Sequence, residues 1–459
     1  MAENEALRAL YAQLAKALGG PHWRGALQLL AARLLSAQYY PQRYQLRLAD
    51  YEETGAFAEP AAATVWDMVA AGQTQRAAEA LRQACAAYPG LAAALGDAQE
   101  WDAGALAAQL SYLMRPGDDA AAVLDDFLSF CAGRETRDDF RTPADVAALM
   151  AALAVPAGAS VYDPHCACGA LLAAGRRAGG GALCAQPRSD EAQGLAALEL
   201  ALAGAPVHLA PAGAALVQDG WHGCAFDAVL LNPPFNQTGW SGAKSAKDES
   251  AARWPYGPPP RSNANFAWLQ YALRHLRENG RAAVLLPNGA LTSQVQRERA
   301  IRAALVQAGA VRAVIALPGG LFYNSRVPCS LWLLQRGAPL ADLLLLDACA
   351  MAHKTAGHGR KTRALGEDAR EKLCALVRSF ESGALSCKSA EYAVVPLAQA
   401  AADECLLSPN LYTDAPVRGQ RAPHAEWEGL TRELAALLEE DAALNKRLKR
   451  QLEAMGFGR

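Results

Sequence analysis

The stretch "FDAVLLNPPFNQTGW", residues 226–240, joins an apolar run to a pair of prolines. The run is almost continuously apolar, which is typical of a parallel strand that is buried on both faces. Asn232 follows it, and Pro233 and Pro234 then fix the backbone and offer no amide hydrogen. The pattern predicts a strand that ends in a rigid turn, with an amide at Asn232 and an aromatic ring at Phe235.

Further short apolar runs surround this stretch between about residues 140 and 350. They read "ASVYD", "GALCA", "APVHLA", "RAAVLLP", "VRAVIALP", "CSLWLLQ" and "LLLLDA". Segments with helical spacing separate the early runs, and this alternation predicts a doubly wound, Rossmann-like α/β sheet. The last runs show no obvious crossover helices, so we expect an antiparallel strand near one edge. Ligands of such sheets bind beyond the carboxyl ends of the strands.

Three domains are expected along the chain. Residues 1–128 show only helical spacing, interrupted by prolines, and predict an all-helical N-terminal domain. Residues 129–395 hold the α/β domain, and residues 396–459 form a tail that ends in one long amphipathic helix. That helix either packs on its own protein or docks a partner.

The composition limits the possible functions. The chain has 459 residues, 52% of them hydrophobic, and a formal net charge of −2, so a basic surface over the whole molecule is excluded. Any contact with nucleic acid must use local patches or a partner that carries the charge. Eleven cysteines without a CxxC pair favour a reducing cytoplasm. We expect neither a signal peptide nor a membrane-spanning segment.

A second motif, "VYDPHCACGALL" at residues 161–172, predicts a strand, a tight turn and the start of a helix. Gly169 permits a close backbone approach, and the helix amides after it could face a ligand's carboxylate or ribose. The glycines of a dinucleotide-binding loop are missing, and His165, Cys166 and Cys168 are spaced too tightly for a metal site, so no metal is expected. An ordinary βα turn with buried cysteines is the alternative interpretation.

The Asn-Pro-Pro-Phe string suits one particular chemistry. An exocyclic amine on a nucleobase is a poor nucleophile because its lone pair is delocalised into the ring. The Asn232 amide oxygen and the Pro233 carbonyl could accept its two hydrogens, and the prolines would hold that carbonyl in place. Phe235 offers a face for a base taken out of the stack, whose amine then attacks a methyl sulfonium. A merely rigid strand exit is the alternative.

Taken together, these motifs resemble the modification (M) subunit of type I restriction–modification systems, a γ-class DNA adenine-N6 methyltransferase that uses S-adenosylmethionine. "DDFRTPADVAALM" resembles the family's F-x-T-P stretch, "DPHCACGALL" its D-P-x-C-G-S-G loop, and "VQDGW" lies where the family has G-D-T-L. Several stretches between residues 253 and 412, from "RWPYGPPP" to "LLSPNLY", also resemble the sequences of this family. The resemblance covers the chain from about residue 130 onward and implies a methyltransferase domain over residues 129–395.

The resemblance also implies roles for individual residues. The catalytic residues would be Asn232, Pro233, Pro234 and Phe235. Asp219 would accept a hydrogen bond from the adenine amine of the cofactor. The full set of implied cofactor-binding residues is Asp139, Phe140, Arg141, Thr142, Pro143, Asp163, Cys166, Cys168, Gly169, Ala170, Gln186, Pro187 and Asp219.

One departure from the family concerns the cofactor's ribose. The family has G-Q-E after the second strand, where the acid binds the ribose hydroxyls, but this chain has Pro187 at the acid's place. Asp190 or Glu191 could take over that role. Without a charge-assisted acceptor, cofactor binding would lose on the order of a few kcal/mol.

The implied partners follow from the same resemblance. They are a specificity (S) subunit, duplex DNA with a flipped adenine and, as a further candidate, a restriction (R) subunit. The tail at residues 396–459 would serve partner docking, and the DNA target sequence would be set by the S subunit.

Three other functions compete with DNA methylation. A catalytically weak or inactive methyltransferase-like subunit that binds partner and DNA is the first alternative, and Pro187 is its main support. A protein glutamine methyltransferase uses a similar Asn-Pro-Pro string but normally has tyrosine after it. A nicotinamide-dependent oxidoreductase lacks support because its glycine fingerprint is missing.

Overall fold

The computed structural model describes residues 2–18, 23–38, 61–86, 88–95, 110, 112–113, 118–134, 141–241, 252–323, 325–337, 341–355, 363–385 and 388–414. Contacts divide the chain into two compact units, Met1–Thr413 and Asp414–Arg459. The fold below is that of the first unit. The long C-terminal helix predicted from the leucine stripe lies outside the described residues, and the three-domain division stays a prediction.

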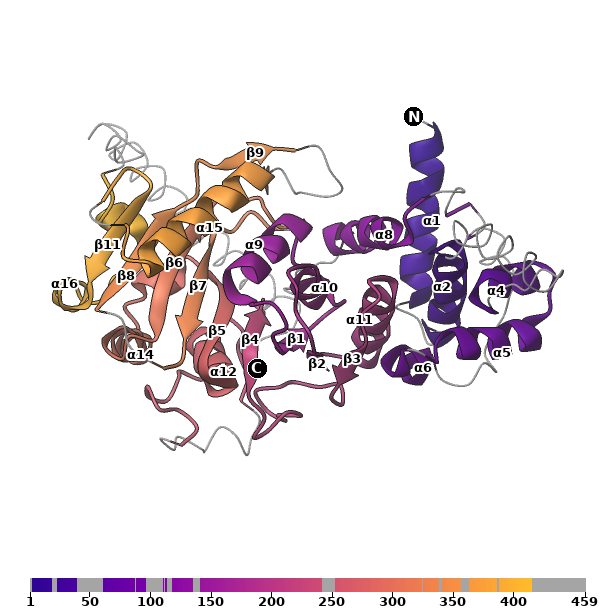
Figure 1. Ribbon diagram of the computed structural model, residues 1–459, viewed down its shortest axis with the longest axis horizontal. Helices are drawn as coiled ribbons and strands as arrows, with labels where there is room; N and C mark the ends of the chain where they lie inside the picture. The colour runs from indigo at the N-terminus through magenta and orange to yellow at the C-terminus, as the bar shows by residue number, and fades with distance from the viewer. Residues whose placement is uncertain are drawn as a thin grey trace, which may run out of the picture. The chain divides into compact units, whose positions relative to one another are not determined.

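A nine-stranded sheet with the order β11-β8-β6-β7-β5-β4-β1-β2-β3 forms the centre of the first unit (Figure 1). Its strands are β1 (Val161–Cys166), β2 (Leu183–Pro187), β3 (Val207–Leu209), β4 (Phe226–Leu231), β5 (Leu276–Pro287), β6 (Val311–Leu317), β7 (Cys329–Gln335), β8 (Asp342–Asp347) and β11 (Tyr392–Pro396). β9 (Ala352–Lys354) and β10 (Arg363–Leu365) form a separate pair. The order confirms the doubly wound, Rossmann-like prediction.

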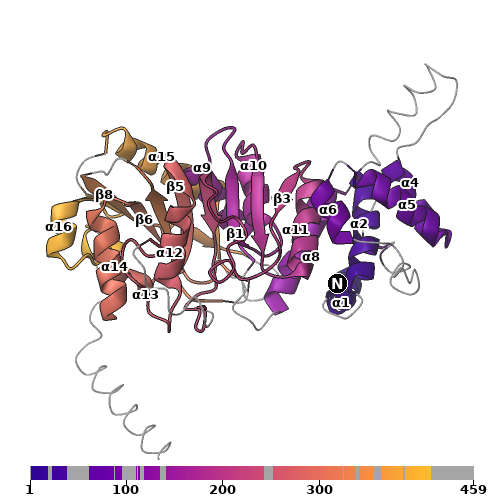
Figure 2. The ribbon, with the colours of Figure 1, turned by 90° about the horizontal axis from the view of Figure 1, so that it is seen from below.

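Helices cover both faces of this sheet (Figure 2). One face carries α9 (Ala144–Ala154), α10 (Ala170–Arg177) and α15 (Glu367–Glu381), and the other carries α12 (Asn265–Arg274), α14 (Gln296–Gln307) and α16 (Leu397–Ala402). In β4, Ala228 and Leu230 pack into the first layer, whereas Val229 and Leu231 pack into the second. Both sides of the strand are buried, which explains its continuous apolar run.

The antiparallel strands differ in part from the sequence expectation. β11 is antiparallel to β8 at one edge, as expected, but β7 is also antiparallel and lies inside the sheet between β5 and β6. The sequence interpretation missed α14, which crosses over from β5 to β6 and leaves a space that β7 fills. The short connection from β6 to β7 has no room for such a helix, so β7 runs back beside β6.

The described elements before residue 141 are all helices. They are α1 (Ala2–Leu18), α2 (Trp23–Gln38), α4 (Ala61–Ala70), α5 (Thr74–Ala84), α6 (Pro89–Leu95) and α8 (Ala120–Arg134). Their apolar core continues into α11 (Asp190–Leu202), which contributes Leu198 and Leu202. Figure 1 shows this helical group beside α11 and β3. Within the described ranges, no helix is long and apolar enough to cross a membrane.

Candidate active site

The candidate site lies beyond the carboxyl ends of β4, β1 and β2, which are neighbours in the sheet. The chain leaves β1 toward β2 on one side and later returns to β4 on the other, so the strand order reverses here. A first pocket is lined by Arg141, Thr142, Asp163, His165, Ala167, Cys168, Gly169, Ala170, Leu171, Asn232 and Pro234. It therefore joins three of the motifs that the sequence singles out.

A second pocket adjoins the first and shares Arg141, His165, Ala167, Cys168 and Pro234 with it. Its other lining residues are Ala15, Leu18, Phe127, Leu128, Cys131, Arg188, Ser189, Glu191, Ala192, Leu195, Ala214, Leu216, Gln237, Trp240 and Trp268. The residues from Ala15 to Cys131 in this list come from α1 and α8, so the N-terminal helices form one wall of the second pocket. The two pockets together are called the composite cleft below.

Asn232 lies directly after β4 and is buried, with 8% of its surface exposed. Its Nδ2 atom donates a hydrogen bond to Thr142 Oγ1 across 3.0 Å, and both side chains line the first pocket. Pro143 is the residue before α9, so Thr142 is held at the start of that helix. The sequence placed these two motifs in one site, and the structure brings them into direct contact.

The turn after the prolines is fixed by the beginning of α12. Asn236 adopts a left-handed backbone with φ of 53°. Its amide donates to Asn265 Oδ1 at 3.1 Å, and Asn265 Nδ2 donates back to Asn236 Oδ1 at 2.9 Å. Ala264 N also donates to the carbonyl of Gln237 at 3.0 Å. The strand exit is therefore rigid, as the two prolines predict, with Pro233 buried and Pro234 lining both pockets.

Phe235 occupies a different environment from its neighbours. Only 9% of its surface is exposed, and its ring meets that of Phe322 edge to face, with 6.0 Å between centroids. It belongs to the apolar layer beneath α9 rather than to the lining of either pocket. The role of Phe235 as a stacking face for a base stays a prediction, because its buried ring would first have to become exposed.

The end of β1 and the loop after it are shaped by one carboxylate and one glycine. Gly169 has φ of 88°, and a Cβ atom there would lie 3.2 Å from the Ala196 backbone, so only glycine fits. Asp163 is buried and accepts a hydrogen bond from His165 N at 3.0 Å. Burial raises the pKa of Asp163 to about 7, although the His165 amide favours the charged form. Ala170 begins α10 and lines the first pocket.

The two cysteines of this loop are buried thiols. Burial raises the pKa of Cys166 well above its usual value and that of Cys168 to about 11, so both are protonated at neutral pH. The cysteines that the structure describes are all free. Across the described ranges, no group of three histidine, cysteine or acidic residues is placed to hold a metal ion. Cys166 lines neither pocket, whereas Cys168 lines both.

Arg141 is buried and pairs with residues of two helices. Its Nη2 atom lies 2.6 Å from Asp125 Oδ1 in α8, and its Nη1 atom lies 3.1 Å from Glu199 Oε2 in α11. Nη1 also contacts the Cys168 sulfur. The predicted neighbours Asp139 and Phe140 lie outside the described residues.

Gln186 and Pro187 end β2 and support the loop that follows β3. Gln186 Nε2 donates to the Gln218 carbonyl at 2.7 Å, and its Oε1 accepts from Gly220 N at 3.1 Å. The Pro187 carbonyl accepts from Gly213 N at 2.8 Å. Neither side chain lines the composite cleft, so their predicted contact with the cofactor stays a prediction.

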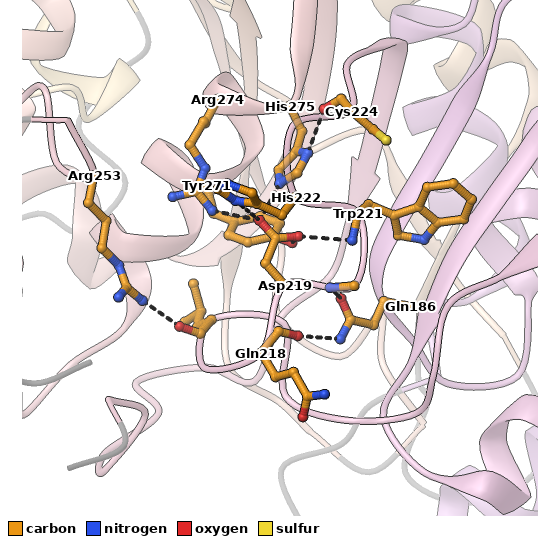
Figure 3. Close-up of polar contacts among 12 residues, drawn as sticks. Gln186, Gln218, Asp219, Trp221, His222, Cys224, Arg253, Tyr271, Arg274 and His275 are labelled. Atoms are coloured by element: carbon orange, nitrogen blue, oxygen red, sulfur yellow. Dashed lines mark hydrogen bonds and ion pairs between the residues drawn. The ribbon is translucent and has the colours of Figure 1, made fainter. Parts of the chain in front are cut away.

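Asp219 lies at the centre of a polar network at the end of α12 (Figure 3). Its carboxylate accepts from Tyr271 Oη at 2.8 Å, from Arg274 Nη2 at 3.0 Å and from Trp221 N at 3.1 Å, and lies 3.1 Å from His275 Nε2. Burial alone would raise the pKa of Asp219, but the contacts with His275, Tyr271 and Arg274 lower it to about 2. Asp219 does not line the composite cleft, whereas Asn232 and Asp163 do.

Several lining residues were missed by the sequence reasoning. Ala214 and Leu216 reach the second pocket from the loop after β3, where the sequence pointed to Asp219 instead. Arg188 and Glu191 line it at the start of α11, and of the two substitute acids considered there, only Glu191 does so. Trp268 faces His165 edge to face, with centroids 5.7 Å apart. No local signal in the sequence places this tryptophan in a pocket.

Comparisons with known proteins identify the family of this chain. A sequence model of the family described as N-6 DNA Methylase matches residues 118–416. The chain is 29% identical over 355 residues to the type I restriction enzyme HindI methylase subunit of Haemophilus influenzae, a match that covers 73% of this chain and 78% of that protein. It is 27% identical over 342 residues to the MjaIX methylase subunit of Methanocaldococcus jannaschii, covering 69% of this chain and 59% of that protein.

A solved structure shows the same fold. The type I restriction-modification system methyltransferase subunit of Streptococcus thermophilus matches with a TM-score of 0.66 and 20% identity. The match covers 89% of this chain and 99% of that one. The likeness therefore extends beyond the central sheet to most of the chain.

Proposed function

Because this chain belongs to the N-6 DNA methylase family, we propose that it methylates adenine at N6 in duplex DNA as the modification subunit of a type I restriction–modification system. The observation that carries the proposal is the first pocket, which is lined by Asn232, by Asp163 of β1 and by Gly169 of the loop after β1. A nucleobase amine and a methyl donor must meet in such a place.

The methyl donor of the family is S-adenosylmethionine, which supplies a methyl group on a positively charged sulfur. The residues of the first pocket fit its methionine end. Ala170 and Leu171 begin α10 there, and the first amides of a helix attract a carboxylate. Gly169 allows a close approach, and the Asp163 carboxyl suits a cationic amine. The nucleoside end would then occupy the second pocket near Arg188, Glu191 and Ala214.

On this proposal the end of β4 holds the substrate amine. The bond from Asn232 Nδ2 to Thr142 fixes which end of the amide donates, and Oδ1 at the other end is the acceptor we assign to the adenine N6 hydrogens. The Pro233 carbonyl is the second acceptor, and the prolines limit its movement. With both hydrogens held, the N6 lone pair is directed toward the methyl group, and preorganised acceptors avoid reorganisation during transfer.

The proposed partners follow from the family and the charge. With a net charge of −2, the chain would share DNA binding with a specificity subunit that selects the target sequence. A restriction subunit is a further candidate partner, and the cytoplasm is the proposed location. In the tail predicted for residues 396–459, α16 packs on the sheet, so we assign partner docking to the unit Asp414–Arg459.

Long-read sequencing of host DNA tests the proposal directly. DNA from a strain that lacks this gene should lose N6-methyladenine at one sequence motif. Reintroducing the gene should restore the modification, and reintroducing the Asn232→Ala variant should not. Unchanged methylation in the deletion strain would exclude the proposed function for that host.

A second candidate is a weakly active or inactive subunit that binds partner and DNA. It is favoured by Pro187, which replaces the family's ribose-binding acid, and by Asp219, whose carboxylate is engaged by the end of α12. Isothermal titration with S-adenosylmethionine separates the two functions. Binding in the micromolar range, alone or with the specificity subunit, supports the enzyme, and no measurable binding supports the inactive subunit.

A further inference from the structure

Arg141 lies next to the residue that contacts the catalytic amide. It precedes Thr142, whose hydroxyl oxygen accepts the hydrogen bond from Asn232 Nδ2. The segment before α9 belongs to no strand, and Pro143 ends it without a side-chain cap. Neither strand pairing nor a side-chain cap therefore holds Thr142, and the neighbouring Arg141, whose guanidinium is paired with three residues, can fix this segment.

The guanidinium of Arg141 is fully used at its terminal nitrogens. Nη1 donates to Cys168 Sγ and to Glu199 Oε2, and Nη2 donates to Asp125 Oδ1 and to Glu199 Oε1. Each terminal nitrogen of a guanidinium carries two hydrogens, so these contacts engage all four. Two protein carboxylates already face the group, which disfavours a further carboxylate from a ligand. Arg141 is therefore better suited to hold the protein together than to bind the cofactor's carboxylate.

The partners of Arg141 come from two separate helices. Glu199 lies in α11, and its side chain is 13% exposed, while Asp125 lies in α8 of the N-terminal helices and is 44% exposed. A second buried bond fixes α8, because Ser129 Oγ donates to Tyr323 Oη at 2.9 Å. The helix that presents Asp125 is thus itself attached to the catalytic part, at the loop after β6.

We propose that Arg141 is a positioning residue, which α8 and α11 hold through Asp125 and Glu199 so that Thr142 keeps the Asn232 amide in its catalytic orientation. This inference rests on the proposed function, because it assigns Asn232 to the transfer step. It gives the N-terminal helices a role in catalysis that is separate from any contact with DNA. The planar fork of arginine is required, because lysine cannot make the paired bonds to Glu199.

The test uses the full chain with its specificity subunit. Methyl transfer from tritiated S-adenosylmethionine is measured on genomic DNA from a strain that lacks the gene. Glu199→Gln, which keeps the shape of the side chain, should lower kcat about 10-fold or more, since small misplacements of a reacting group are costly. The Kd for S-adenosylmethionine should change much less than kcat, because Glu199 lines neither pocket. Arg141→Lys should show the same separation of kcat from Kd.

Glu381→Gln serves as a matched control. Glu381 is 18% exposed at the end of α15 and pairs with Arg281 at 3.0 Å, away from the composite cleft. Glu381→Gln should lower the unfolding temperature about as much as Glu199→Gln does, while its kcat stays unchanged. Equal losses of kcat in both glutamine variants would overturn the inference, as would full kcat in Glu199→Gln. If Glu199→Gln does not fold, Asp125→Asn replaces it at the more exposed partner.

A second measurement does not depend on activity. Amide hydrogen exchange of peptides that cover residues 141–154 and 226–240 should become faster in Glu199→Gln than in Glu381→Gln. If the wild-type complex transfers no methyl group to DNA, the proposed function fails, and exchange alone decides the inference. Faster exchange in both segments would then support the positioning role, and unchanged exchange would refute it.

Discussion

Asn232 and Thr142 lie 90 positions apart in the sequence, and the Asn232 amide donates to the Thr142 hydroxyl across 3.0 Å. Asn232 directly follows β4 and Thr142 lies just before α9, so the bond joins the end of the strand that carries the proposed chemistry to the helix covering it. The amide orientation is therefore a property of two motifs acting together. Changes at either residue should affect the same step.

Replacing Asn232 by alanine removes the proposed acceptor for the adenine amine. Asn232→Ala should lower methyl transfer by at least about 10²-fold, the usual effect of deleting one group that stabilises a transition state. The loss of one buried hydrogen bond should cost about 1 kcal/mol of unfolding free energy, so the chain should still fold. Tritium incorporation into DNA and thermal unfolding measure the two effects, and full activity would contradict the assigned role.

Thr142 offers a matched pair of substitutions. Thr142→Val keeps the shape of the side chain but removes the oxygen that accepts from Asn232, and it should lower kcat about 10-fold. Thr142→Ser keeps the oxygen and should recover most of that loss. Steady-state kinetics with saturating cofactor compares the two. Equal losses would mean that the hydroxyl alone does not sustain catalysis, which would contradict the role assigned to this hydrogen bond.

The parts of this fold that follow local rules could be predicted from sequence. The apolar run before Asn232 indicates a strand buried on both faces, and the two prolines indicate its rigid exit. Gly169 indicates a close approach of the backbone. In the structure, a Cβ atom added at this position would lie only 3.2 Å from the Ala196 backbone. Each of these signals depends on residues that are adjacent in the chain.

The remaining features depend on contacts that no local pattern encodes. Asp219 pairs with the end of α12 more than 50 positions later, and this pairing decides that its carboxylate faces α12. The helical spacing of residues 263–279 would carry α12 past Arg274, but the helix ends there because Leu276 pairs with Phe226 and begins β5. The wall that α1 and α8 contribute to the composite cleft also arises only from tertiary packing.

The missing ribose-binding acid can be tested by restoring it. Pro187→Glu should tighten S-adenosylmethionine binding about 10-fold if a charge-assisted hydrogen bond to the ribose is otherwise absent. Glu191→Gln should weaken binding to a similar degree if Glu191, which lines the second pocket, already supplies that bond. Isothermal titration of both variants decides between the two cases. Affinities equal to wild type in both would show that the ribose hydroxyls are bound by other groups.

Asp163 should couple cofactor binding to pH. Its pKa is raised to about 7 by burial, whereas burial lowers the pKa of His165 and raises that of Cys166, so both neighbours are uncharged near neutrality. A cationic ligand beside Asp163 favours the ionised carboxylate. Binding below about pH 7 should therefore release a proton, and affinity should rise with pH until about pH 7 and then level off.

Titration in buffers of different ionisation enthalpy measures that proton. Asp163→Asn should abolish the release and flatten the pH dependence of Kd. The same raised pKa affects folding, because the folded state keeps its proton while the unfolded state loses it near pH 4. The stabilising effect of the protonated carboxyl is present below about pH 4 and is lost as pH rises toward 7. If the enthalpy of cofactor binding to the wild type does not depend on the buffer, no proton is released on binding and the coupling of cofactor binding to pH is ruled out.

Asp219 allows two roles to be separated by one variant. Its pKa is lowered to about 2, so its contribution to stability is present above about pH 4 and is lost as pH falls from about 4 to about 2. A shift of this size corresponds to roughly 2 kcal/mol, and Asp219→Asn should lower the unfolding free energy at pH 7 by about that amount. Tyr271→Phe removes one of its donors and should have a smaller effect in the same direction.

The ligand preference of Asp219→Asn then identifies the role of Asp219. If the carboxylate accepts from the adenine amine, the wild type should bind S-adenosylhomocysteine more tightly than S-inosylhomocysteine, and Asp219→Asn should lose this preference. If Asp219 only anchors the loop carrying Ala214 and Leu216, the variant should weaken both ligands equally. The network with Tyr271, Arg274 and His275 already engages the carboxylate, so we expect the equal loss. A selective loss for the adenine ligand would restore the role that the family resemblance implies.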